Sequence, residues 1–144
     1  MVGVRALEQQ KRQFSPGESA TFVKTITSAD IEIFAALSGD HNPLHLNSEY
    51  AAKTRFKQRI AHGMLTASLI STVIGMYLPG PGAIYLGQEL KFIKAVFVDD
   101  TITASVTMDV FDQEKKLMTL KTSCINQHGE TVLRGEAKVR YEPV

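Results

Sequence analysis

The sequence of 144 residues contains one cysteine and carries almost no net charge. A lone cysteine, Cys124, cannot form a disulfide within the chain, and it excludes zinc or iron–sulfur sites built from several cysteines. The 16 basic residues nearly balance the 15 acidic ones, so the net charge is +1, which argues against a nucleic-acid-binding protein. With 44% hydrophobic and 22% charged residues, the composition predicts one soluble globular domain over residues 1–144.

Membrane-spanning and secretory segments are not expected. No long apolar stretch follows the basic residues near the N-terminus, as a secretory signal would require. An uncharged apolar segment, residues 64–78, would span about 22 Å as a helix. A bilayer core needs about 30 Å, and glycine and proline flank the segment. We therefore predict a buried core helix and a cytoplasmic protein.

Periodicity and turn residues predict the order of the elements. A helix over residues 29–37 is expected to be capped by Ser28 and to end at Gly39. Pro43 argues against a helix through the loop at 39–45, and Ser48 can cap a short helix at 49–53. Runs rich in β-branched residues or of alternating polarity predict strands at 20–27, 83–93, 101–111, 117–126 and 131–141.

The helix at 64–78 has no polar face, so it must be covered on nearly all sides. The strands after it predict an antiparallel meander. In the strand at 101–111, apolar residues alternate with Thr, Ser and Asp, namely Ile102, Ala104, Val106, Met108 and Val110. An antiparallel sheet that curls around a long central helix, the α+β hot-dog fold, would cover it. A flatter sheet together with a second subunit would also do so.

A group of polar residues that suits proton transfer lies in the loop after the first helix. Asp40 and His45 are five residues apart and Pro43 lies between them, so both side chains can point into one cleft. A carboxylate and an imidazole that share one water can move protons near pH 7. Asn42 can donate and accept, and could therefore hold a water, a carbonyl or the loop itself. Asp, Asn and Pro are also common in turns for reasons of backbone geometry alone.

The string F-x2-L-S-G-D-x-N-P-L-H-x5-A, from Phe34 to Ala51, resembles the signature of the hydratase 2 / MaoC-like family. The stretch from Ile60 to Leu65 resembles the start of that family's central helix. Residues 90–97 resemble its F-x-x-P-V segment, with Ala95 where proline is common. The resemblance covers nearly the whole chain. It implies a homodimeric hot-dog enzyme that reversibly hydrates trans-2-enoyl-CoA to (R)-3-hydroxyacyl-CoA.

The resemblance also implies roles for individual residues. Asp40 and His45 would hold and deprotonate the water, and Asn42 would position the substrate or the loop. The N–H of Gly63 would stabilise the enolate oxygen, which agrees with the unpaired N–H groups and positive dipole end of a helix start. Ser71 would lie near the catalytic pair, or else would bond to the carbonyl four residues earlier. His62 would line the substrate pocket, or else be satisfied by the backbone.

The resemblance implies neither a metal nor a cofactor. His41 and His45 are four residues apart, as metal ligands on a helix can be, but Pro43 argues against a helix there. Basic residues could bind coenzyme A phosphates or an acidic carrier protein, or could form a solvated loop. These are Arg55, Lys57, Arg59, Lys91 and Lys94.

Three other functions compete with the hydratase. A 3-hydroxyacyl-carrier-protein dehydratase of fatty-acid synthesis would use the same chemistry on an acyl group carried by a protein instead of coenzyme A. A hot-dog acyl-CoA thioesterase often has a carboxylate on the central helix, and residues 64–78 contain neither Asp nor Glu. A non-catalytic acyl-CoA-binding protein would not need both Asp40 and His45.

Overall fold

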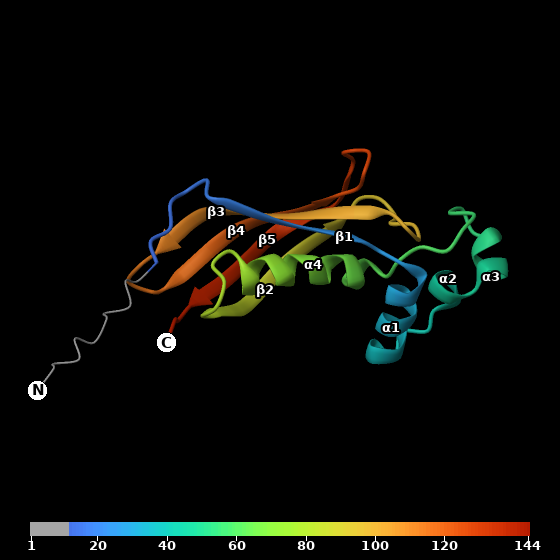
Figure 1. The fold of residues 1–144 in the computed structure, drawn as a ribbon, viewed down its shortest axis with the longest axis horizontal. Coiled ribbons are helices and arrows are strands. Elements are labelled where there is room, and N and C mark those ends of the chain that lie inside the picture. The colour runs from blue at the N-terminus through green and yellow to red at the C-terminus, as the bar shows by residue number, and fades with distance from the viewer. Residues whose placement is uncertain (1–11) are drawn as a thin grey trace, which may run out of the picture.

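The computed structural model describes residues 12–144 as one antiparallel sheet with a long helix along one face (Figure 1). Three shorter helices gather beyond the N-terminal end of that helix. In chain order the elements are β1 (Ser19–Thr25), α1 (Ser28–Ser38), α2 (Pro43–Leu46), α3 (Ser48–Ala52), α4 (Gly63–Met76), β2 (Ala83–Phe92), β3 (Thr101–Asp112), β4 (Leu117–Ile125) and β5 (Thr131–Tyr141). The predicted α+β class is confirmed, and every predicted strand is present.

The order of the strands in the sheet is β1-β3-β4-β5-β2. The meander prediction is correct for β3, β4 and β5, which pair with their neighbours in the chain. It is wrong for β2, which pairs with β5 at one edge, while β1 pairs with β3 at the other. Which strand β2 pairs with depends on the path of the connection between β2 and β3, residues 93–100. This connection has no hydrophobic periodicity from which its path could be predicted.

The side chains of β3 alternate as predicted only as far as Met108. Ile102, Ala104, Val106 and Met108 are buried in the core beneath the sheet. The pairing with β4 then shifts between Met108 and Val110, and Val110 is exposed. One extra residue in a strand reverses which face the following side chains occupy, so Val110 does not share the buried face of the four residues before it in the alternating series.

Helix α4 covers the middle of the sheet and contacts β1, β2, β3 and β4. Its buried side chains are Thr66, Leu69, Ile70, Val73 and Ile74. Its other face, which includes Met64, Ser68, Ser71 and Met76, is exposed in the single chain. The sheet therefore covers one side of the helix and leaves the other side open. None of the helices in residues 12–144 is long and apolar enough to cross a membrane.

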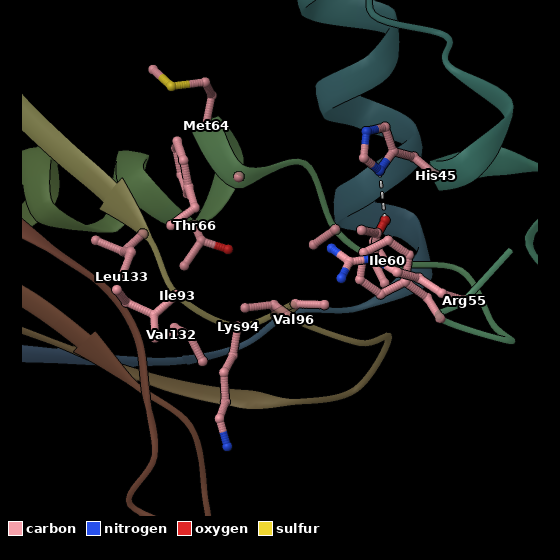
Figure 2. Close-up of a pocket in the computed structure, with 15 residues that line it drawn as sticks. His45, Arg55, Ile60, Met64, Thr66, Ile93, Lys94, Val96, Val132 and Leu133 are labelled. Carbon is pink, nitrogen blue, oxygen red and sulfur yellow. Dashed lines mark hydrogen bonds between the residues drawn. The ribbon is translucent and has the colours of Figure 1, made fainter.

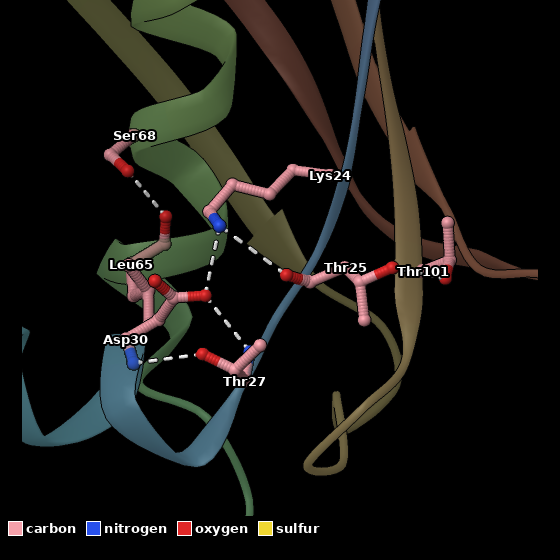
Figure 3. A network of polar contacts seen from close by, with 7 residues as sticks. All are labelled: Lys24, Thr25, Thr27, Asp30, Leu65, Ser68 and Thr101. Carbon is pink, nitrogen blue, oxygen red and sulfur yellow. Dashed lines mark hydrogen bonds and ion pairs between the residues drawn. The ribbon is translucent and has the colours of Figure 1, made fainter.

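Helix α1 is held at its start by a capping box, and the cap is Thr27 rather than the predicted Ser28. The Asp30 N–H donates to Thr27 Oγ1 at 3.1 Å, and the Thr27 N–H donates to the Asp30 carboxylate at 2.9 Å. Lys24 of β1 pairs with the same carboxylate at 2.9 Å (Figure 3). Helix α1 is thus fixed to the edge of the sheet.

The loop after α1 is shorter than predicted. Gly39 ends α1 in the left-handed conformation, with φ 82°, as predicted. Asn42 then caps the one-turn helix α2, which begins at Pro43, so His45 lies on a helix and not in a loop. A proline is well suited to this first helical position, because no N–H is needed there. Asn47, rather than the predicted Ser48, caps α3.

Candidate functional site

Asp40 lies in the exposed turn between α1 and α2. Its backbone N–H donates to Ser38 Oγ at 3.2 Å, and its carboxylate Oδ1 accepts the N–H of Asn42 at 3.2 Å. The Asn42 side chain accepts the N–H of Leu44 at 3.1 Å and thereby caps α2. These short-range bonds hold Asp40 at a set place relative to the helix that carries His45.

His45 is nearly buried, with 8% of its surface exposed. Its Nδ1–H donates to the carbonyl of Ile60 at 2.7 Å. A carbonyl can only accept, so this bond fixes the proton on Nδ1 and leaves the lone pair of the neutral ring on Nε2. The His45 ring is therefore oriented as a base with one defined basic atom.

His62 is the third member of the cluster, and it comes from the residue just before α4. Only 2% of its surface is exposed, and its Nε2–H donates to the backbone carbonyl of Asp40 at 2.9 Å. Its ring lies 3.9 Å from the His45 ring, centroid to centroid, at an interplanar angle of 31°. One potential ligand atom from each of Asp40, His45 and His62 lies within 4.8 Å of the other two. The structure thus brings together three of the six predicted site residues.

A pocket of about 350 Å³ opens beside this cluster. Figure 2 shows His45 and its bond to Ile60 on one side of the pocket, with Leu133 and Ile93 on the other. Gly63 and Thr66, from the first turn of α4, also line it. The pocket therefore adjoins both an oriented imidazole and the start of a helix, with apolar walls able to take a hydrocarbon chain.

Gly63, at the start of α4, lies against the side chain of Phe92. A Cβ at this position would lie 2.6 Å from Cε1 of Phe92, which is closer than real carbon atoms approach. The phenyl ring of Phe92 thus lies directly against the Gly63 backbone at the edge of the pocket. The N–H groups of this first turn have no partner within the helix and carry its positive dipole end, so they can bind a developing negative charge.

Of the predicted site residues, only His45 and Gly63 line the pocket; Asp40 lies beside His45, and Asn42, Ser71 and His62 also lie outside the lining. Asn42 caps α2 and so acts on the loop. Ser71 is exposed on the open face of α4, two turns beyond Gly63. His62 is packed behind the pocket, with its Nε2–H satisfied by the backbone, and this is the second of the two alternatives that the sequence left open for it.

Arg59 has an internal role that sequence reasoning missed. Its Nε–H donates to the carbonyl of His45 at 2.6 Å, and its Nη1 donates to Ser28 Oγ at 3.0 Å. It therefore joins the end of α2 to the start of α1, and it does not lie free in a solvated basic loop. No short motif connects residues 28, 45 and 59, so only the folded chain could have identified this contact.

Thr66 is the other residue that was missed. It lines the pocket, is buried, and its Oγ1 has no hydrogen-bond partner among the described residues. The only available signal was a hydroxyl in the first turn of an uncharged helix. A buried hydroxyl without a partner is costly, so a ligand or water in the pocket would be a suitable partner for it.

Burial sets the electrostatics of His45. Desolvation lowers the pKa of His45 below its ordinary value, and the charge of His62 lowers it further. The bond to the Ile60 carbonyl and the charge of Asp40 act in the opposite direction. The net decrease keeps the His45 ring neutral, and hence basic, to a lower pH than an exposed histidine.

The cluster of Asp40, His45 and His62 also has the donor types of a metal site. However, each imidazole has one nitrogen bonded to a carbonyl, so each ring has one nitrogen left for an ion. The two rings contact each other, with centroids 3.9 Å apart and planes tilted by 31°, whereas the ligand atoms of one ion must point to a common centre at about 2 Å. The geometry favours proton transfer, and the absence of a metal or cofactor from the reaction stays a prediction. His41 lies outside this group, and its Nδ1 bonds to Gly39.

A family model described as "MaoC like domain" matches residues 10–128. The chain belongs to the MaoC-like domain family. An (R)-specific enoyl-CoA hydratase of Rhodospirillum rubrum is 53% identical over 123 residues, which are 85% of each protein. The (R)-specific enoyl-CoA hydratase of Aeromonas caviae is 46% identical over 86% of this chain and 92% of that protein. The solved structure of an (R)-hydratase from A. caviae involved in PHA biosynthesis superposes with a TM-score of 0.87 at 44% identity, covering 90% of this chain and 98% of that one. The predicted MaoC-like hot-dog fold is confirmed.

Proposed function

We propose that this chain reversibly hydrates trans-2-enoyl-CoA thioesters to (R)-3-hydroxyacyl-CoA. The observation that carries the proposal is the oriented His45 ring. Its Nδ1–H is held by the Ile60 carbonyl, so the lone pair of the neutral ring is on Nε2. The residue lies in one cluster with Asp40 and lines a pocket that adjoins a helix start. The relatives named as (R)-specific enoyl-CoA hydratases support the substrate class and the stereochemistry.

The reaction adds the oxygen of water to C3 of the enoyl group and a proton to C2. Asp40 and His45 hold the water and remove one proton from it as its oxygen bonds to C3. We assign this role to the pair, because two coupled groups titrate as a unit. The same pair returns the proton to C2, so that one water is consumed in the forward direction and released in the reverse.

Negative charge develops on the thioester oxygen when C3 is attacked. The N–H of Gly63 lies at the positive end of α4 and is our candidate for the donor to this oxygen. A single donor of this kind typically lowers the barrier by about 2.7–4 kcal/mol. The apolar walls of the pocket, including Leu133, Ile93 and Val96, would hold the acyl chain.

Coenzyme A is the proposed carrier of the acyl thioester. Arg55 and Lys94 line the same pocket and bring positive charge to it, although Lys94 is also paired with Glu130. A phosphate-bearing thioester is attracted by such side chains. An acyl carrier protein would present a phosphopantetheine group to the same pocket, and the assay below compares the two carriers directly.

The first prediction tests the catalytic pair. Hydration of crotonyl-CoA and of longer trans-2-enoyl-CoA substrates is followed as loss of enoyl absorbance, and the product is resolved by chirality. We expect the (R)-product from the wild type, and losses in kcat of on the order of 10²–10⁴-fold for Asp40→Asn and for His45→Ala. The exposed Glu32→Ala variant on α1 is the control and should retain full activity.

Three outcomes would contradict the proposal. Unchanged hydration by the Asp40 and His45 variants would remove the pair from the mechanism. Release of free coenzyme A thiol without loss of the enoyl group would indicate a thioesterase. Hydration of enoyl-carrier-protein at a kcat/KM well above that of the matched enoyl-CoA would identify the carrier protein, and not coenzyme A, as the carrier of the acyl thioester.

We also propose that the enzyme is a homodimer. The open face of α4 and the free edge of the sheet at β2 both carry large exposed apolar side chains. These are Met64, Met76, Ile84, Tyr85, Leu86, Phe92 and Ile93. A long apolar edge strand is a site for pairing with another chain, and the net charge of +1 opposes association very little. A cytoplasmic location stays a prediction from the sequence.

A further inference from the structure

His62 contacts both members of the proposed catalytic pair from behind the pocket. Its Nε2–H donates to the carbonyl of Asp40, 22 residues earlier in the chain. Its ring packs on the ring of His45 and, on α1, lies 4.8 Å from that of Phe34, centroid to centroid. His62 is also the residue before Gly63, the proposed oxyanion donor. A single buried side chain thus connects the three groups that the reaction requires.

The location of His62 is not explained by helix capping. It occupies the N-cap position of α4, yet its side chain caps no N–H of the helix. Serine, threonine, asparagine or aspartate would serve that purpose better. In addition, its Nδ1 is buried without a partner among the described residues, which costs free energy. The interactions that His62 does make are the hydrogen bond to the Asp40 carbonyl and the contact with the His45 ring.

The Asp40 turn needs such a tether. It is exposed and follows Gly39 in the left-handed conformation, and the bonds of its own side chain and N–H reach only two residues away. The His62 bond is the contact that joins this turn to α4. Without it, the distance between the Asp40 carboxylate and the start of α4 would be set by the turn alone.

We propose that His62 is a positioning residue that fixes the Asp40–His45 pair relative to the Gly63 N–H. This role rests on the proposed hydratase function and differs from contact with substrate, because the His62 side chain is 2% exposed and its Nε2–H is bonded to the Asp40 carbonyl. A water held by the pair must meet C3 while the thioester oxygen meets the helix start. Misplacement by about 1 Å can cost on the order of 10²-fold in rate.

His62 also affects the protonation of its neighbour. Its charge lowers the pKa of His45. The other charged groups around His45 are Asp40 from the α1–α2 turn, Arg59 on its carbonyl, and Arg55 and Lys94 in the pocket. Replacing His62 by a neutral side chain removes one of the causes that lower the pKa of His45. The acid limb of kcat/KM should then move to higher pH, which loss of folded protein alone would not produce.

Two variants separate the hydrogen bond from the ring. His62→Phe keeps a ring against His45 and removes the donor to Asp40, whereas His62→Gln places an amide N–H near the position of Nε2 and removes the ring. We expect His62→Phe to lower kcat on crotonyl-CoA by on the order of 10²-fold, with KM changed less than about threefold, and His62→Gln to recover at least a tenth of wild-type kcat. Both variants should shift the acid limb upward. His128→Gln, an exposed histidine in the β4–β5 turn, is the matched control.

The tautomers of the wild-type histidines give a test that needs no variant. Long-range ¹H–¹⁵N spectra of the imidazoles should show the proton on Nδ1 for His45 and on Nε2 for His62. A proton on Nδ1 of His62 would overturn the inference. So would an increase in KM alone, equal losses in both variants with an unshifted acid limb, or full activity of His62→Phe. Failure of the wild type to hydrate any enoyl thioester would instead overturn the proposed function.

Discussion

At the scale of single residues, three histidine positions in this chain behave differently because of what each nitrogen contacts. His45 and His62 are buried and bonded through opposite nitrogens to backbone carbonyls. His41, also in the signature, is exposed and bonds locally to Gly39. Residue type and spacing cannot separate these cases, because the partner carbonyls of the two buried rings lie 15 and 22 residues away in the chain.

The lowered pKa of His45 predicts where activity falls on the acid side. The proposed catalytic pair needs the neutral His45 ring, so activity should persist below the ordinary histidine value of 6.5. The stability of the fold should fall in the same direction of pH. A histidine whose pKa is lower in the folded than in the unfolded state makes its full contribution to stability above pH 6.5, and this contribution is lost as pH falls through the folded pKa. The measurement is kcat/KM for crotonyl-CoA from pH 5 to 8, with circular dichroism at each pH. An acid limb centred at or above 6.5 would contradict the assignment.

Gly63 and Phe92 should show coupled effects. Gly63→Ala puts a Cβ 2.6 Å from the Phe92 ring, so either the ring or the start of α4 must move. We expect kcat to fall by on the order of 10²-fold. Phe92→Leu alone should cost much less, and the double variant should recover most of the loss of Gly63→Ala. Additive losses in this cycle would show that the two side chains act independently.

At the scale of elements, α1 matters because the turn that carries Asp40 begins where it ends. The capping box of Thr27 and Asp30 ties the start of α1 to β1 through Lys24, and Gly39 at its end turns the chain toward Asp40. Arg59 makes a second contact between the start of α1 and His45 of α2. The two helices on either side of the Asp40 turn are therefore held by side chains outside the turn.

Removing the cap should destabilise the protein by a measurable amount. Thr27→Ala is expected to lower the free energy of unfolding by about 1 kcal/mol, measured by urea denaturation at one fixed protein concentration. The Thr27 N–H and Lys24 lower the pKa of Asp30, so its contribution is present above 3.8 and is lost as pH falls through the folded pKa. Glu32→Ala on the same helix is the control. An equal effect of the two variants would contradict the role of the cap.

At the scale of the whole molecule, the single chain leaves its central helix covered on one side only. The buried side of α4 packs on four strands, and the open side carries Met64, Ser71 and Met76. A second copy is the covering that we propose. Ser71, which the resemblance places near the catalytic pair, lies on this same open face, so its neighbours in a dimer would come partly from the partner subunit.

The dimer prediction is tested at the two edges of the sheet. Leu86→Lys adds a charge at the β2 edge, and Val23→Lys adds one at the opposite edge, where Val23 is similarly exposed, at 57% against 53% for Leu86. We expect light scattering after gel filtration to show a dimer for the wild type and for Val23→Lys, and mostly monomer for Leu86→Lys. A monomeric wild type, or dissociation only by the Val23 variant, would contradict the proposed interface.

The sequence by itself predicted the long helix, the helices α1 and α3 and all five strands, and it supplied the candidate site residues. The apolar helix and the strands follow from local periodicity, and the signature from Phe34 to Ala51 supplies Asp40 and His45 within a few residues. The tertiary structure alone decided which strand lies beside which, that Val110 is exposed, and that Arg59 and His62 bond to the carbonyls of His45 and Asp40. The physical reason is the range of the interactions. Periodicity, caps and turns act over a few residues, whereas the pairing of β2 with β5 and the bonds to the carbonyls of Asp40, His45 and Ile60 join segments that only folding brings together.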